Sequence, residues 1–293
     1  MSAQSLWRVT VETTAEAEEA VGAFLESYFG QASSSYTDME TGRVTCTVFL
    51  KKPPAKWDKL SHIMQEVGLN CVPKCLTLSR VRKEDWAESW KRHFKPFTVG
   101  NALLVKPSWS RRKPARGQAL VILDPGLSFG TGQHPTTRFC LEQLAEARQP
   151  GLRQSFLDVG TGSGILAIAA AKLGYAPVRA FDFDPAAVRI AQDNARKNHV
   201  RVPSKRADIT KIAVGSTKYD IVCANLTADL LESCAAKLQR FLKPGGLLVL
   251  AGILRTQIEG VRKTFQKRGF RTFKSHAEGE WESLALAHRP AIG

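Results

Sequence analysis

Residues 156–172 read FLDVGTGSGILAIAAAK, and this stretch decides the fold of the second half of the chain. An apolar strand runs into a turn with glycines at 160, 162 and 164, and an alanine-rich helix follows directly. Glycine allows a tight turn and close approach of a ligand, and the first N–H groups of the helix point toward that ligand. The order strand–turn–helix therefore predicts a nucleotide-like binding site, with a purely structural turn as the alternative.

The sequence on both sides of this turn alternates between short apolar strands and helices. Strands are predicted at SFLDVG, PVRAFDFD, YDIVCANL, GLLVLAGI, 270–276 and 281–288, with helices near 164–174, 185–198, 228–242 and 256–268. This alternation is typical of right-handed βαβ units in a parallel sheet that is covered on both faces. Ligands of such sheets bind beyond the carboxyl ends of the strands.

Acidic residues stand at the predicted strand ends. Asp158 directly precedes the glycines and could meet an ammonium group, whereas the third glycine comes one residue too early for a dinucleotide fingerprint. Asp182 ends the next strand, where a carboxylate can accept hydrogen bonds from both ribose hydroxyls. Asp184 is better placed to cap the following helix. Asp208 could meet an adenine amino group or be a surface carboxylate.

The first 79 residues show a different pattern. Strands are expected at 6–12, 32–38, 43–50 and 72–80, and helices at 14–29, capped by Thr13 or Thr14, and from Pro53 to Gly68. The order β-α-β-β-α-β is the ferredoxin-like pattern.

An amphipathic helix is predicted next, over residues 82–95. Trp86, Trp90 and Phe94 would share one face of it, either packed on a neighbouring domain or as a platform for a nucleic acid. We therefore divide the chain into a ferredoxin-like domain over 1–79, a linker helix over 80–98 and an α/β cofactor-binding domain over 99–293.

Composition excludes several classes of protein. The longest apolar runs of this 293-residue chain have about eight residues, whereas a membrane-spanning helix needs about 20. The N-terminus is acidic and lacks the apolar region of a secretory signal. The six cysteines fit neither a zinc site nor a redox pair, so we expect no metal, reduced thiols and a cytoplasmic location.

The net charge of +15 is unevenly distributed. Residues 80–117 carry 11 lysines and arginines against 3 acidic residues, whereas residues 1–79 carry 7 against 9. A basic segment can steer a protein toward RNA or a ribonucleoprotein. A solvated basic surface without a partner is the alternative.

The glycine turn, the acid at the end of the second strand and Asn225 at the end of the fourth resemble class I S-adenosylmethionine-dependent methyltransferases. A narrower resemblance lies upstream, where residues 123–137 read LDPGLSFGTGQHPTT and look like the signature loop of the ribosomal protein L11 methyltransferase family. The 164–174 helix and the Asn225-Leu226 pair are similar to that family as well.

The resemblance implies a Rossmann-like domain with a seven-stranded, mostly parallel sheet, and S-adenosylmethionine as cofactor. The matching cofactor ligands are Thr137, Gly160, Asp182 and Asn225, to which the residues themselves add Asp158 and Gly162. Thr136 or Thr137 could instead cap the helix that follows. Phe129, expected to contact the cofactor, and His134 lie in a glycine-rich loop that could close over it.

The implied reaction is methylation of lysine side chains or the N-terminal amine of ribosomal protein L11, free or bound to the ribosome, and the resemblance implies that the 1–79 domain recognises this substrate. A neutral amine attacks the sulfonium methyl, with Asn225 orienting the amine and His134 as a candidate general base. The basic 80–117 segment could also contact ribosomal RNA.

Two other functions compete with this one. An enzyme that methylates RNA bases would carry two prolines and an aromatic residue after Asn225, because a flipped base stacks on that aromatic ring, and this chain has Leu226-Thr227-Ala228 instead. A non-catalytic, cofactor-binding module of the ribosome is the second competitor.

Overall fold

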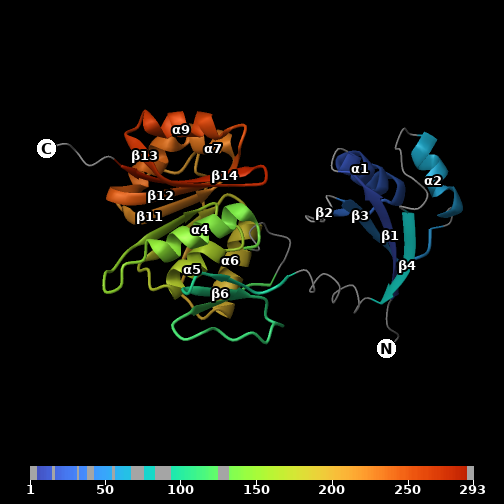
Figure 1. Cartoon of the computed structure of the whole chain (residues 1–293), viewed down its shortest axis with the longest axis horizontal. Coiled ribbons are helices and arrows are strands. Elements are labelled where there is room, and N and C mark those ends of the chain that lie inside the picture. Colours follow the sequence, from blue (N-terminus) through green and yellow to red (C-terminus); the bar gives the residue numbers. More distant parts are fainter. Residues whose placement is uncertain are drawn as a thin grey trace. The chain divides into compact units, whose positions relative to one another are not determined.

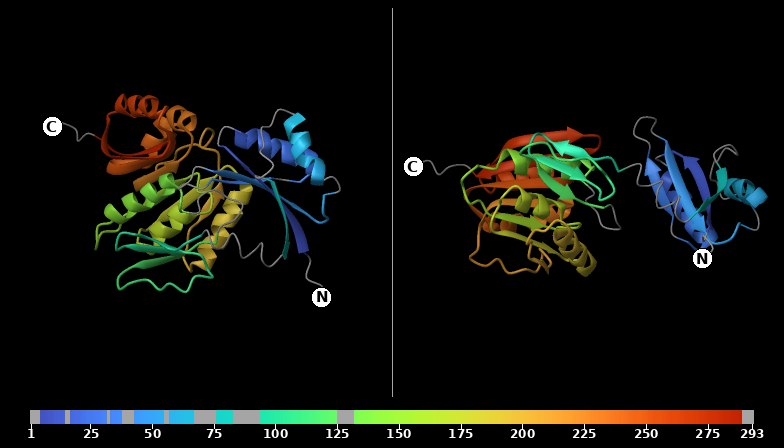
Figure 2. Two further views of the ribbon diagram at one scale, coloured as in Figure 1. Left: turned by 45° about the vertical axis from the view of Figure 1, so that its right-hand side comes forward. Right: turned by 90° about the horizontal axis from the view of Figure 1, so that it is seen from below.

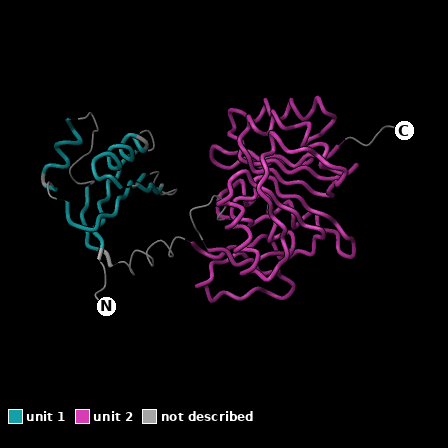
Figure 3. Tube along the Cα trace, turned by 180° about the vertical axis from the view of Figure 1, so that it is seen from behind, with its two compact units in different colours: residues 1–93 teal, residues 94–293 magenta. Residues whose placement is uncertain are grey.

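The computed structural model describes residues 5–14, 17–31, 33–37, 43–54, 57–66, 76–82, 94–124 and 132–288. The chain separates into two compact units, residues 1–93 and 94–293 (Figure 3). Strand β4 (Leu76–Arg82) and strand β5 (Phe97–Val99) include residues that the sequence assigned to the linker helix over 80–98. That prediction is wrong at both ends because these residues pair with neighbouring strands, and its centre, 83–93, lies outside the described residues.

The first unit has the element order β-α-β-β-α-β that the sequence predicts. Its elements are β1 (Ser5–Thr13), α1 (Glu18–Phe29), β2 (Ser34–Thr37), β3 (Val44–Leu50), α2 (Trp57–Glu66) and β4. The strands form an antiparallel sheet in the order β2-β3-β1-β4. Alternate residues of β1 and β3 pack against both helices, with a core of Val9, Val11, Val21, Leu25, Val44, Cys46, Val48, Leu60 and Met64.

Helix α1 begins later than predicted. Neither Thr13 nor Thr14 caps it, because the carbonyl of Thr14 accepts a turn hydrogen bond from the N–H of Ala17. Ala17 then takes the N-cap position without a side-chain hydrogen bond.

The described part of the second unit contains a seven-stranded sheet in the order β10-β9-β8-β11-β12-β14-β13 (Figure 1). The strands are β8 (Phe156–Val159), β9 (Val178–Asp182), β10 (Ser204–Arg206), β11 (Tyr219–Asn225), β12 (Leu242–Leu254), β13 (Phe270–Glu278) and β14 (Trp281–His288). Strands β8 to β12 are parallel, and β14 is antiparallel to both β12 and β13. The predicted fold, a mostly parallel seven-stranded sheet, is confirmed.

Helices cover both faces of this sheet. They are α4 (Pro135–Glu146), α5 (Ile165–Lys172), α6 (Pro185–Lys197), α7 (Ala228–Ser233), α8 (Ala235–Phe241) and α9 (Ile258–Gln266). Because successive side chains of a strand point to opposite faces, the buried strands feed two cores. Phe156 and Cys223 pack with α4, α5 and α6, whereas Leu157 and Val222 pack with α7, α8 and α9. Figures 1 and 2 show the helices on the two sides of the sheet.

A second, three-stranded sheet was not predicted from the sequence. Strands β5, β6 (Leu103–Lys106) and β7 (Ala119–Ile122) contribute Val99, Leu103 and Val121 to the core beneath α4 and α5. Asn198, just after α6, holds β7 in place. Its Oδ1 accepts from the N–H of Ile122 and its Nδ2 donates to the carbonyl of Ile122, each at 2.7 Å.

None of the described helices is both long and apolar enough to span a membrane.

Candidate functional site

The glycine turn joins β8 to α5 at the carboxyl edge of the parallel strands. The N–H groups of Gly160 and Thr161 both donate to the carbonyl of Phe181 on the neighbouring strand β9, at 3.0 and 3.1 Å. Gly160 has a φ of +73°, and a Cβ added there would lie 2.5 Å from Cδ2 of Leu226. A residue with a side chain would therefore be strained in the turn and would displace the side chain of Leu226.

Asp182 connects this turn to the end of β9. It is 7% exposed, and its Oδ2 accepts from the N–H of Gly162 at 2.9 Å while its Oδ1 accepts from the N–H of Asp184 at 3.0 Å. A carboxylate offers about four lone-pair positions, so these two bonds leave acceptor capacity for a ligand. Asp184 caps α6 as predicted, because its Oδ1 accepts from the N–H of Ala186 at 2.7 Å.

Asp158 lies beneath the turn and is buried. Its Oδ2 accepts from the Thr161 hydroxyl at 2.7 Å and from the N–H of Ala167 at 3.3 Å. Burial, with a smaller contribution from the nearby Asp182, raises the pKa of Asp158 to about 7 against the lowering effect of the two hydrogen bonds. A cation close to this carboxyl would favour its ionised form.

A cavity of about 440 Å³ opens at the carboxyl ends of β8, β9 and β11. Its lining is Val159, Gly160, Gly162, Phe181, Asp182, Phe183, Ala207, Asp208, Ile209, Thr210, Asn225, Leu226 and Leu230. The structure thus brings together four residues that the sequence predicts for the site, Gly160, Gly162, Asp182 and Asn225, with Asp208, for which the sequence left an adenine contact and a surface position open. The volume lies within the range of about 300–1,000 Å³ that is usual for small-molecule sites.

The apolar residues that line this cavity were not predicted from the sequence. Phe183 is 72% exposed although it is a large apolar residue, and it directly follows Asp182. Ile209 directly follows Asp208 in the same way. The sequence feature that could have predicted these walls is an aromatic or branched residue directly after a carboxylate at the end of a strand. Leu226 and Leu230 gave no such signal, because only the turn from β11 into α7 brings them over Gly160.

Asn225 joins the cavity to α4. Its Nδ2 donates to Oγ1 of Thr136 at 3.3 Å and lies 3.5 Å from Oγ1 of Thr137. Both threonines are buried inside the first turn of α4, so neither is its cap. The N-cap position belongs to His134, without a side-chain cap bond.

His134 stands beside the same network. Its Nδ1 lies 2.7 Å from Oγ1 of Thr136, and its ring meets the ring of Trp281 edge-on at 5.0 Å between centroids. Burial lowers the pKa of His134, while Glu280 and Glu278 at the turn between β13 and β14 act in the opposite direction.

Comparison with known proteins identifies the family. The family described as ribosomal protein L11 methyltransferase (PrmA) matches residues 5–289. The chain belongs to this family. The L11 methyltransferase of Desulforamulus reducens is 40% identical over 244 residues, 80% of this chain and 76% of that protein. The L11 methyltransferase of Syntrophotalea carbinolica is 43% identical over 208 residues, which are 71% and 67% of the two chains.

A solved structure of the same family supports the fold. The crystal structure of ribosomal protein L11 methylase from Lactobacillus delbrueckii subsp. bulgaricus aligns with a TM-score of 0.61 at 28% identity. The alignment covers 67% of this chain and all of that one. The resemblance that the sequence indicated to the L11 methyltransferases is therefore confirmed.

Part of the family's signature loop lies outside the described residues. Phe129 falls in the segment 125–131, so its predicted contact with a cofactor remains a prediction. Asp208 lines the cavity, and hydrogen bonds from the hydroxyl and N–H of Thr210 lower the pKa of its carboxyl.

Within the described ranges, no three or more His, Cys, Asp or Glu side chains are grouped to hold a metal ion. The described cysteines, Cys46, Cys140, Cys223 and Cys234, are free and buried.

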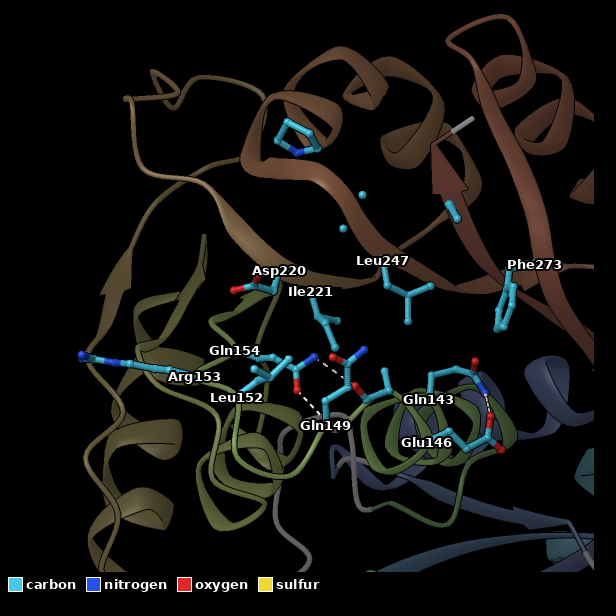
Figure 4. Close-up of a pocket in the computed structure, with 15 residues that line it drawn as sticks. Gln143, Glu146, Gln149, Leu152, Arg153, Gln154, Asp220, Ile221, Leu247 and Phe273 are labelled. Atoms are coloured by element: carbon cyan, nitrogen blue, oxygen red, sulfur yellow. Dashed lines mark hydrogen bonds between the residues drawn. The ribbon is translucent and has the colours of Figure 1, made fainter. Parts of the chain in front are cut away.

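A second cavity, of about 690 Å³, lies at the opposite edge of the sheet, where β11 and β12 begin. Figure 4 shows Gln149 and Gln154 near Asp220 and Ile221, and Gln143 near Phe273 at the other end of the cavity. It is lined by none of the predicted site residues. The cavity at the carboxyl ends of the strands is therefore the candidate active site of this L11 methyltransferase family member.

Proposed function

We propose that this protein transfers methyl groups from S-adenosylmethionine to lysine side chains or the N-terminal amine of ribosomal protein L11. One observation carries the proposal: Gly160, Gly162, Asp182 and Asn225 line one cavity at the carboxyl edge of a methyltransferase-type sheet. Membership of the L11 methyltransferase family gives the substrate.

The residues of the cavity fit the cofactor. Asp182 keeps lone pairs for two ribose hydroxyls, whereas a phosphate in that position would be repelled by the carboxylate. Phe183, Ile209 and Leu226 offer flat or branched apolar surface for an adenine ring. Asp158 lies outside the lining, beneath the glycine turn, and its carboxyl suits the cationic amino-acid part of the cofactor and not a pyrophosphate. Thr137 and Phe129 complete the proposed cofactor contacts.

The bound cofactor supplies a methyl group activated on a sulfonium cation. The acceptor must be a neutral amine, although a free lysine has a pKa of about 10.4. Burial beside a cation lowers that pKa, because desolvation and like charge both disfavour the ammonium form. Asn225 then needs only to hold the amine in line, and no strongly basic side chain is required. Positioning of this kind can contribute several kcal/mol to lowering the barrier.

We further propose that residues 1–79 recognise L11. This segment is the only one of the three sequence segments with an acidic balance, and L11 as an RNA-binding ribosomal protein is expected to be basic. Charge reversal at Glu16, Glu18 and Glu19 tests the idea, and unchanged methylation of L11 would contradict it.

We also propose that the basic 80–117 segment contacts ribosomal RNA, and part of this segment is the stretch between β6 and β7. Residues 111–117 are all exposed, and they include Arg111, Arg112, Lys113 and Arg116. Exposed cations of this kind bind phosphates with a strong dependence on salt.

A cytoplasmic location agrees with the free state of the described cysteines.

Transfer of a tritium-labelled methyl group tests the proposed reaction. The purified protein is incubated with labelled S-adenosylmethionine and with ribosomal proteins and RNA from a strain that lacks the enzyme. We expect one labelled protein, with the size of L11. Label in RNA would instead favour the base-methylating function. Salt-sensitive RNA binding without any transfer would favour the non-catalytic module.

A further inference from the structure

The hydroxyl of Thr136 lies between the two side chains that could act on a methyl acceptor. Thr136 is fully buried in the first turn of α4. Its Oγ1 is 2.7 Å from Nδ1 of His134 and 3.3 Å from Nδ2 of Asn225. One oxygen atom thus connects the residue before α4 to the end of β11.

The directions of these hydrogen bonds follow from the donors available. Nδ2 of Asn225 can only donate, so Oγ1 of Thr136 accepts from it. The hydroxyl has one hydrogen of its own, and among the described residues the acceptor placed to receive it is Nδ1 of His134. Nδ1 can accept only if it carries no proton, which places the proton of the neutral ring on Nε2.

The same bonds decide which way the Asn225 amide faces. With Nδ2 turned to Thr136 and Thr137, Oδ1 lies at the opposite edge of the planar amide group. Gly252 of β12 keeps that side clear, because a Cβ added there would lie 2.9 Å from Oδ1. The oxygen is therefore left to accept a hydrogen bond from an amine.

We propose that Thr136 is a positioning residue: through its hydroxyl it turns the Asn225 carbonyl oxygen toward the methyl acceptor and holds His134 as the Nε2–H tautomer. The catalytic consequence of this inference rests on the proposed methyl transfer, whereas the tautomer of His134 does not depend on that function. Trp281 supports the arrangement by packing edge-on against the imidazole ring. In this arrangement His134 does not accept the proton of the amine, and its ring serves to orient the hydroxyl.

Two substitutions separate the hydroxyl from the shape of the side chain. Thr136→Val keeps the branched shape and removes the hydroxyl. We expect kcat to fall about 10- to 100-fold, because a small misplacement of a reacting group has an effect of this size. The KM for S-adenosylmethionine should change by less than about threefold. Thr136→Ser keeps the hydroxyl, and we expect kcat within about threefold of the unmodified protein. An unchanged kcat in Thr136→Val, or equal losses in both variants, would overturn the proposal.

A measurement on the protein without substrate keeps the test independent of catalysis. Nitrogen-15 NMR of the histidine rings distinguishes the two neutral tautomers, and substitution of His134 by glutamine assigns its signals among the six histidines. We expect the Nε2–H pattern for His134 in the unmodified protein and in Thr136→Ser. An Nδ1–H pattern would overturn the proposal even if Thr136→Val failed to fold. Absence of methyl transfer by the unmodified protein would contradict the proposed function and leave the tautomer result standing.

Discussion

The carboxylate of Asp182 accepts a hydrogen bond from the backbone N–H of Gly162, with 2.9 Å between Oδ2 and the nitrogen. Two adjacent strands are thereby tied together at the edge where the cavity opens, since Asp182 ends β9 and Gly162 belongs to the turn after β8. The same side chain orders the glycine turn and keeps acceptor positions for a ligand. Structure and binding therefore depend on one carboxylate.

Substitution of Asp182 should weaken the binding of S-adenosylmethionine. Asp182→Asn removes the negative charge and one of the two acceptor atoms, and a hydrogen bond to a charged group contributes about 1.5–3 kcal/mol. We expect the Kd for S-adenosylmethionine, measured by calorimetry, to rise about 10- to 100-fold. Asp184→Asn is the matched control, because asparagine caps a helix as well as aspartate does. Equal affinities of the two variants would argue against a ribose contact of Asp182.

A Cβ at Gly160 should displace the wall of the cavity. Gly160→Ala combines a φ of +73° with a contact of 2.5 Å to Leu226. Gly151→Ala is the control, since its φ is +83° but a Cβ there meets nothing within 4 Å. Both variants should melt at a lower temperature, because alanine is strained at positive φ. Only Gly160→Ala should also lose cofactor affinity, and a similar loss in Gly151→Ala would refute the steric explanation.

Phe183 should contribute to binding without contributing to stability. Phe183→Ala removes an aromatic ring that is 72% exposed at the cavity, and stacking of a base on an aromatic side chain is worth about 1–3 kcal/mol. We expect the affinity for S-adenosylmethionine to fall about fivefold or more with an unchanged melting temperature. Phe273→Ala serves as control, because Phe273 is equally exposed but lies at the other cavity. Loss of affinity in both variants, or in neither, would contradict the assignment.

The titration of Asp158 should make the stability of the ligand-free protein depend on pH. Burial raises the pKa of this carboxyl from 3.8 to about 7 in the folded protein, so the folded state holds the proton more tightly than the unfolded chain. The free energy of unfolding should therefore fall as pH rises from about 4 to 7, and this fall should level off above about pH 7.

Asp158→Asn is the comparison for this pH effect. It keeps an acceptor for the Thr161 hydroxyl and removes the titration. Urea unfolding of both proteins at pH 5, 6, 7 and 8 should show a weaker pH dependence in the variant, since all other groups titrate in both. Parallel curves would show that Asp158 keeps an ordinary pKa.

Most of the catalytic fold could be predicted from local patterns. Strands and helices alternate from Phe156 onward, and the structure confirms the predicted strand ends, with Gly160 directly after β8 and Asp182 as the last residue of β9. Asp184 could be predicted as a helix cap because Asp followed by Pro is a local signal. The number of strands and their mostly parallel direction followed from the family resemblance, whereas the order of the strands comes from the structure.

Features that depend on contacts between distant segments could not be predicted. Strands β5 to β7 are only three or four residues long, and Asn198 holds β7 from more than seventy positions away. Thr136 looked like a helix cap, but the turn at His134 places it one step inside α4, where it meets Asn225 from 89 positions along the chain. Phe183 stands between two aspartates in the sequence, but only the structure shows that its ring lines the cavity.

The intact mass of purified ribosomal protein L11 after incubation with this protein and S-adenosylmethionine tests the central claim most directly. We predict that L11 gains the mass of whole methyl groups on lysine or N-terminal amines, and that Asp182→Asn sharply reduces the gain at the same cofactor concentration. An unchanged mass of L11, with S-adenosylmethionine shown by calorimetry to be bound, would contradict the claim.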